Sequence, residues 1–116
     1  MIRTISDRGE YVSAGAKEIY SQQVPAGKKW TIHAISLTFL YSQFAICRVE
    51  WGKKGENWRV MEGVSSPARS ASKSTWTLTG NGFEQVSANE KLSVSFVTNE
   101  TVDTVYLAIQ VDETDE

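Results

Sequence analysis

Hydrophobic and polar residues alternate with a period of two in several stretches of this chain. Residues 92–96 read LSVSF and residues 105–111 read VYLAIQV, with an apolar residue at every second position. Ala45, Cys47, Val49 and Trp51 form a similar row. A period of two places apolar side chains on one face of a strand. The pattern therefore predicts half-buried β-strands, and no stretch has a helical period of 3.6 residues over three turns.

Turn-forming residues separate these strands. Pro25 and Gly27 predict a tight turn between a polar strand and a long apolar strand, because proline presets φ and glycine tolerates positive φ. Residues 52–57 (GKKGEN) predict a hairpin loop, and residues 98–103 (TNETVD) predict a second hairpin that pairs the strands on either side. Together these signals predict an all-β fold, an antiparallel sandwich of about seven to eight strands.

The long apolar strand changes phase near its middle. Trp30, Ile32 and Ala34 lie on one face, whereas the apolar residues from Ile35 onward occupy the alternate positions. A slip of one residue exchanges the two faces of a strand. The slip predicts either a β-bulge or a bend that carries the strand from one sheet to the other.

Length and charge predict one domain with two peripheral segments. The 116 residues suffice for a single core, which we place at residues 15–112, with an N-terminal arm at residues 1–14 and a solvated acidic tail at residues 113–116. The net charge is −2, and four of the 14 acidic residues lie within residues 112–116. The remaining surplus of two basic residues is too small to indicate a nucleic-acid partner.

Export and membrane insertion are not indicated. The first residues, MIRTISDRGEYV, carry charges where a signal peptide needs an apolar core. The uncharged run from Trp30 to Cys47 is interrupted by polar residues, unlike a bilayer span. Cys47 is the only cysteine, which fits synthesis in a reducing cytoplasm.

No group of residues predicts catalysis, a metal site or a cofactor. His33, the single histidine, lies within a strand and reads as a structural residue. Cys47 shares its row with apolar residues and reads as a small core residue instead of a nucleophile. Glu50, Glu56 and Glu62 lie in and around the 52–57 hairpin without the clear pairing that glycoside cleavage needs. We expect a protein that is not an enzyme.

Four tryptophans are many for this length. Core packing is the default reading for Trp51, which shares a face with Cys47 and Val49, and for Trp58, which shares one with Val60. Trp30 and Trp76 lie beside turns and are the candidates for an exposed platform that stacks on sugar rings, with Tyr41 as a third. They make a carbohydrate-binding module the alternative function.

Residues 23–32 (QVPAGKKWTI) resemble a segment of small β-sandwich virion proteins of tailed bacteriophages, in which V-P-A-G-K precedes an apolar strand. Residues 80–86 (GNGFEQV) and 88–94 (ANEKLSV) are similar to the second half of a jelly roll. The resemblance implies a non-enzymatic capsid-decoration, tail or fibre protein of the virion. It also implies a homotrimer that binds a major capsid or tail protein.

A docking protein of this kind binds its partner at many weak sites. The arm at residues 1–14 is the first candidate contact, through Arg3, Arg8 and Tyr11, because such a segment can order on binding. Arg69 and Lys73, in a segment rich in small residues, would suit an acidic partner.

Overall fold

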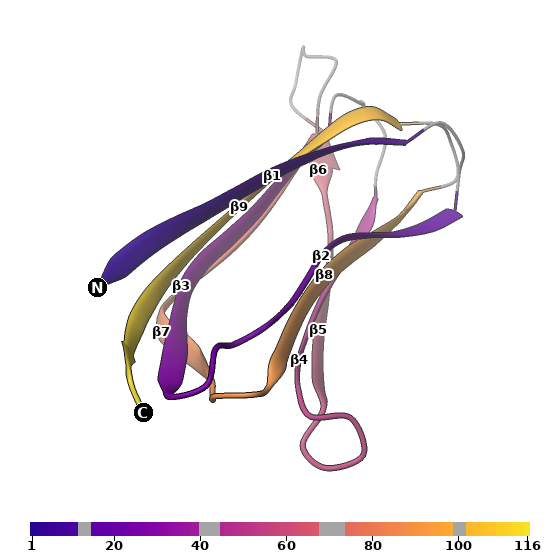
Figure 1. The fold of residues 1–116 in the computed structure, drawn as a ribbon. Coiled ribbons are helices and arrows are strands. Elements are labelled where there is room, and N and C mark those ends of the chain that lie inside the picture. The colour runs from indigo at the N-terminus through magenta and orange to yellow at the C-terminus, as the bar shows by residue number, and fades with distance from the viewer. Residues whose placement is uncertain (12–14, 40–44, 68–73, 99–101) are drawn as a thin grey trace.

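The computed structural model describes residues 1–11, 15–39, 45–67, 74–98 and 102–116. These residues form two antiparallel β-sheets that face each other (Figure 1). The strands are β1 (Ile2–Tyr11), β2 (Gly15–Gln23), β3 (Lys28–Phe39), β4 (Ile46–Gly52), β5 (Arg59–Val64), β6 (Ser66–Pro67), β7 (Ser74–Val86), β8 (Lys91–Thr98) and β9 (Val102–Asp115). One sheet has the order β1-β9-β3-β7-β6 and the other has the order β2-β8-β4-β5. The predicted antiparallel sandwich is confirmed. The described ranges hold no helix that is long and apolar enough to span a membrane.

The strand order is that of a jelly roll. Along most of the chain, successive strands alternate between the sheets, so neighbours within a sheet come from distant parts of the sequence. The hairpin predicted at residues 52–57 is confirmed, because it joins the paired strands β4 and β5. The hairpin predicted at residues 98–103 is wrong: β8 pairs with β2 and β4, whereas β9 pairs with β1 and β3. Alternation identifies the buried face of a strand but not its partner.

A β-bulge accounts for the phase slip in β3. The register of β3 against β9 shifts by one residue between Ile32 and Ala34, which places the extra residue at His33. Because the bulge inserts one residue, Ile32 before it and Ile35 after it both face the core and are fully buried. The predicted bulge is therefore confirmed, one residue earlier than the apolar pattern suggests.

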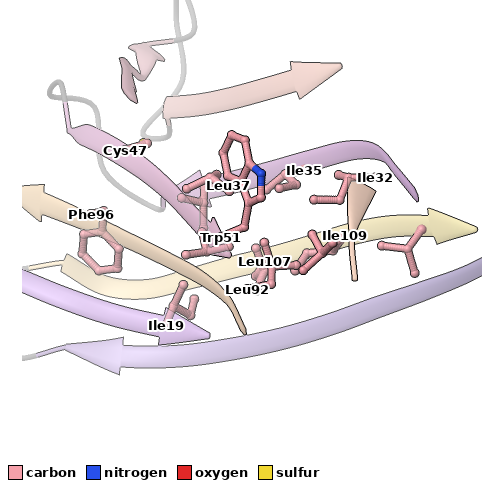
Figure 2. Close-up of a cluster of buried hydrophobic side chains, with 14 of the residues drawn as sticks. Ile19, Ile32, Ile35, Leu37, Cys47, Trp51, Leu92, Phe96, Leu107 and Ile109 are labelled. Carbon is pink, nitrogen blue, oxygen red and sulfur yellow. The ribbon is translucent and has the colours of Figure 1, made fainter. Parts of the chain in front are cut away.

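The core lies between the two sheets (Figure 2). Ile35 and Leu37 of β3 and Ile109 of β9 face Leu92 of β8 and Trp51 of β4 across the sandwich. Phe39 and Phe96 meet edge to face, with ring centroids 5.1 Å apart, and so connect β3 with β8. Such a pair contributes about 0.5–1.5 kcal/mol beyond the area that it buries.

Both segments predicted to lie outside the domain belong to the first sheet. Residues 2–11 of the predicted arm form β1, which pairs with β9 from Ile2 opposite Asp112 to Tyr11 opposite Val102. The predicted acidic tail continues β9 to Asp115 and pairs with the start of β3. Ion pairs help to hold both segments in the sheet: Arg3 binds Glu113 and Lys28 binds Asp115, at N–O distances of 2.8 and 2.7 Å.

Candidate functional site

The two arginines that were predicted to bind a partner, Arg3 and Arg8, contact other residues of the same chain. The Arg3 guanidinium binds Glu113 and lies 5.9 Å from the centroid of the Trp30 ring. The Arg8 guanidinium lies 5.8 Å from the ring of Tyr106. Since they are five positions apart on one strand, they lie on opposite faces of the sheet and form no common site.

The other predicted partner-binding residues fall wholly or partly outside the described residues. The backbone of Tyr11 pairs with Val102, but its side chain is not among the described groups. Arg69 and Lys73 lie within residues 68–73, outside the described ranges.

The predicted glycan platform is not formed by Trp30. Its side chain is 4% exposed, and its Nε1 donates a hydrogen bond of 2.8 Å to Oε2 of Glu113. That bond and the contacts with Arg3 lower the pKa of Glu113 below its ordinary value, although burial acts in the opposite direction. Trp76 pairs with Leu37 through its backbone, whereas its side chain and the whole of Tyr41 lie outside the described part. Trp30 therefore has a structural role in joining β3 to β9.

The other two tryptophans differ from each other. Trp51 is 2% exposed and belongs to the core, as predicted. Trp58 is half-buried in the loop between β4 and β5, and the Lys54 ammonium lies 5.2 Å from its ring centroid. The prediction that Trp58 and Val60 share a core face is wrong, because Val60 is 47% exposed on the outer face of its sheet. Trp58, which follows GKKGEN, is thus the tryptophan with an accessible side chain among those whose side chains the structure describes.

An apolar row crosses the outer face of the four-stranded sheet. Ile46 of β4 lies opposite both Val64 of β5 and Val97 of β8. Their exposed fractions are 47%, 55% and 44%, although each is a large hydrophobic residue. We call these three residues the apolar row. Sequence reasoning missed it because each residue, taken alone, is an ordinary outward position in an alternating strand.

A charged row lies beside the apolar row. Two residues further along the strands, Arg48 of β4 faces Glu62 of β5, and their N–O distance is 3.0 Å. Arg48 also approaches Glu50 to 3.4 Å. An apolar strip bordered by paired charges has the composition of a protein-binding surface with a polar rim.

A hollow of about 390 Å³ lies at the opposite end of the same sheet, beside the loop between β4 and β5 that projects at the bottom of Figure 1. We call it the hairpin hollow. Its lining residues come from β2, β4, β8 and two loops: Gln23, Gly52, Lys53, Lys54, Trp58, Asn89 and Lys91.

The loop beside this hollow is held by specific contacts. Oδ1 of Asn57 accepts a hydrogen bond of 2.8 Å from the backbone N–H of Lys53, which closes the loop on itself. Glu90, 9% exposed, accepts hydrogen bonds from the Asn57 amide and from the backbone N–H of Ser87. Burial alone would raise the pKa of Glu90, but these bonds and the charges of Arg59 and Lys53 lower it below the ordinary value. Glu90 therefore acts as an anionic anchor for the wall of the hollow.

The two residues considered for catalysis occupy structural positions. Cys47 is fully buried, and burial raises the pKa of its thiol to about 12. At neutral pH it is a protonated core side chain and a poor nucleophile. His33 is the half-buried bulge residue of β3. Within the described ranges, no three His, Cys, Asp or Glu side chains are grouped to hold a metal ion.

The chain is similar to known proteins in its structure and not in its sequence. No protein-family model and no curated protein matches the chain. Among solved structures, the chain is similar to the carbohydrate-binding module TmCBM61, solved in complex with β-1,4-galactotriose. The match has a TM-score of 0.42 and 10% sequence identity, and it covers 99% of this chain and 88% of that one.

Proposed function

We propose that this chain is a non-catalytic interaction protein that docks on a protein partner through the apolar row. The observation that carries the proposal is the alignment of Val64, Ile46 and Val97 across three strands, each about half exposed. Covering such side chains removes apolar area from water, which is the main favourable term in protein association. The neighbouring Arg48–Glu62 pair supplies a polar border that orients the partner.

The row is small, so the proposal requires repeated contacts. Stable protein interfaces bury roughly 1,200–2,000 Å² in total, and three half-exposed aliphatic side chains account for only part of such an area. An oligomer that presents several copies of the row to a symmetric lattice converts weak contacts into firm binding. We propose a homotrimer bound to a capsid or tail protein of a tailed-phage virion, because residues 23–32 resemble such proteins.

We place the docking surface on the apolar row and not on the N-terminal arm predicted from the sequence. Because residues 2–11 are the strand β1, deleting them would remove one of the two sheet partners of β9 and damage the fold. The apolar row is a better candidate, since its side chains can be changed without loss of core packing.

Co-sedimentation with purified capsids and tails of the phage that carries the gene tests the proposal. The wild type is expected to pellet with one of them, whereas the double variant Ile46→Asn, Val64→Asn stays in the supernatant. Val60→Asn is the matched control, because Val60 is also 47% exposed on this face but lies outside the row. Equal pelleting of the double variant and the wild type would reject the row as the docking surface.

Light scattering tests the oligomeric part separately. A trimer has three times the chain mass of 12.9 kDa. A monomer at micromolar concentration would reject the trimer but leave the docking surface to the sedimentation result.

A further inference from the structure

The hairpin hollow combines a preformed shape with a surplus of positive charge, because three lysines line it and one carboxylate, Glu90, lies in its wall. Its volume of about 390 Å³ lies within the range of small-ligand sites. Lys53, Lys54 and Lys91 line it, and among the described residues none of the three forms an ion pair with a carboxylate. Glu90, the buried carboxylate of the wall, is already bonded to Asn57 and Ser87. The hollow is thus suited to a ligand that brings its own negative charge.

The non-ionic lining indicates the shape of that ligand. Trp58 lines the hollow with its half-buried indole, and the Lys54 ammonium lies 5.2 Å from the centroid of that ring. The apolar face of a sugar ring is complementary to an indole, and the ammonium beside it would meet an acidic group on the same sugar. Gln23 and Asn89 add side-chain amides, which can both donate to and accept from neighbouring hydroxyls. The Gln23 amide is fixed by donating a hydrogen bond of 2.9 Å to the backbone carbonyl of Asn89. A ring, hydroxyl groups and an acid together describe an acidic sugar.

We propose that the hairpin hollow binds an acidic oligosaccharide, with a sugar ring against Trp58 and its carboxylate or sulfate groups on Lys53, Lys54 and Lys91. This site is independent of the apolar row, which lies at the other end of the sheet. It also differs from the sequence-predicted platform, because Trp30 is buried. The hollow holds only a few sugar units, so we expect recognition of a short segment of a longer chain.

An acidic peptide or a nucleic acid fits these observations less well. Of the described side chains that line the hollow, one is aromatic, whereas single-stranded nucleic acids are bound along charged grooves with several stacking platforms. An acidic peptide would use the lysines and its backbone would bond to the amides, but its carboxylate side chains have no flat apolar face to place on the indole.

Titration with defined ligands tests the site. Trigalacturonate and a trisulfated heparin disaccharide represent the carboxylate and sulfate sources, and the fully methyl-esterified trigalacturonate is the neutral match. Binding is followed by tryptophan fluorescence and by amide shifts in a ¹⁵N spectrum. At least one acidic sugar is expected to shift the amides of residues 52–58 and 89–91, with the neutral ester bound at least about tenfold more weakly at low salt.

Variants locate the binding on the hollow. Lys53→Gln and Lys91→Gln change exposed side chains and are expected to weaken binding about three- to fivefold each. Trp58→Ala is expected to weaken it about tenfold or more. Lys29→Gln is the matched control outside the hollow and should bind like the wild type.

Three results would overturn the proposal. The first is no binding of either acidic sugar up to about 10 mM, which is weaker than any useful site. The second is equal affinity for the neutral ester, which would show that the lysines do not recognise charge. The third is equally tight binding of a hexaglutamate peptide, which would indicate an unspecific polyanion surface.

Discussion

Replacing Gly52 by alanine should damage the loop between β4 and β5 more than any other single methyl group added there. Gly52 has a φ of +114°, and a Cβ built on it lies 2.5 Å from the backbone oxygen of Asn57. Ordinary contact begins near 3.4 Å, so the Asn57 carbonyl must retreat by about 0.9 Å. Asn57 is held by hydrogen bonds with Lys53 at both its backbone N–H and its Oδ1, so the retreat strains or breaks one of them.

The expected cost follows from these two effects. The unfavourable φ contributes about 2 kcal/mol for a residue with a side chain. Loss of one hydrogen bond adds about 1 kcal/mol. At an unfolding entropy of about 2.1 cal/mol/K per residue, the total of about 3 kcal/mol lowers the melting temperature by about 12 °C.

Gly55→Ala is the matched control in the same loop. Gly55 also has a positive φ, +85°, but a Cβ there meets nothing within 4 Å. Only the left-handed conformation then costs energy, about 1 kcal/mol, or about 4 °C in melting temperature. Thermal unfolding followed by near-ultraviolet circular dichroism measures both variants. Equal losses in the two would refute the reasoning, because the contact with Asn57 would then contribute nothing.

Three further predictions concern buried groups. Because the folded pKa of Glu90 is below 4.5, its contribution to stability is present above about pH 4.5 and is lost as the pH falls through the folded value. Glu90→Gln should therefore lose less stability than the wild type between pH 7 and about pH 3 in urea unfolding; an identical loss would contradict this. Cys47, with a thiol pKa near 12, should react with Ellman's reagent only after denaturation, and rapid labelling of the native protein would disprove its burial. Phe96→Ala should lower the free energy of unfolding by about 3–5 kcal/mol in urea titrations, whereas a loss under 1 kcal/mol would contradict the role of the Phe39 contact.

The sequence predicts the strands of this fold better than their partners. Period-two alternation in residues 92–96 and 105–111 correctly marks the inward residues, and the phase slip in β3 correctly indicates a bulge. The same alternation would fit many pairings, so the short segment after Thr98 looked like a hairpin although β8 and β9 lie in different sheets. Pairing in a jelly roll depends on contacts between distant residues, which a local pattern does not carry.

The sequence alone did not predict the apolar row or the position of Trp58, for a related reason. The apolar row exists only because the register aligns Ile46 with Val64 and Val97, three residues far apart in the sequence. Trp58 and Val60 are two positions apart, so strand alternation predicts the same face for both. Nothing in the neighbouring sequence shows that both lie outside the core. The charges at the two ends of the chain led to a wrong prediction of an arm and a tail. The ion pair between Arg3 and Glu113 becomes evident only when β1 and β9 are placed side by side.

The pairing of β1 with β9 has a consequence for biosynthesis. Within the described residues, the only sheet partner of β1 is β9, so β1 must wait during synthesis until a strand about 100 residues later in the chain has left the ribosome. β3 likewise gains one of its two neighbours only when β9 arrives. Pairings of such long sequence separation make folding slow and leave unpaired edges exposed in incomplete chains. Folding of the five-stranded sheet must therefore follow the synthesis of β9, and stalled chains that lack β9 should be the species that aggregate.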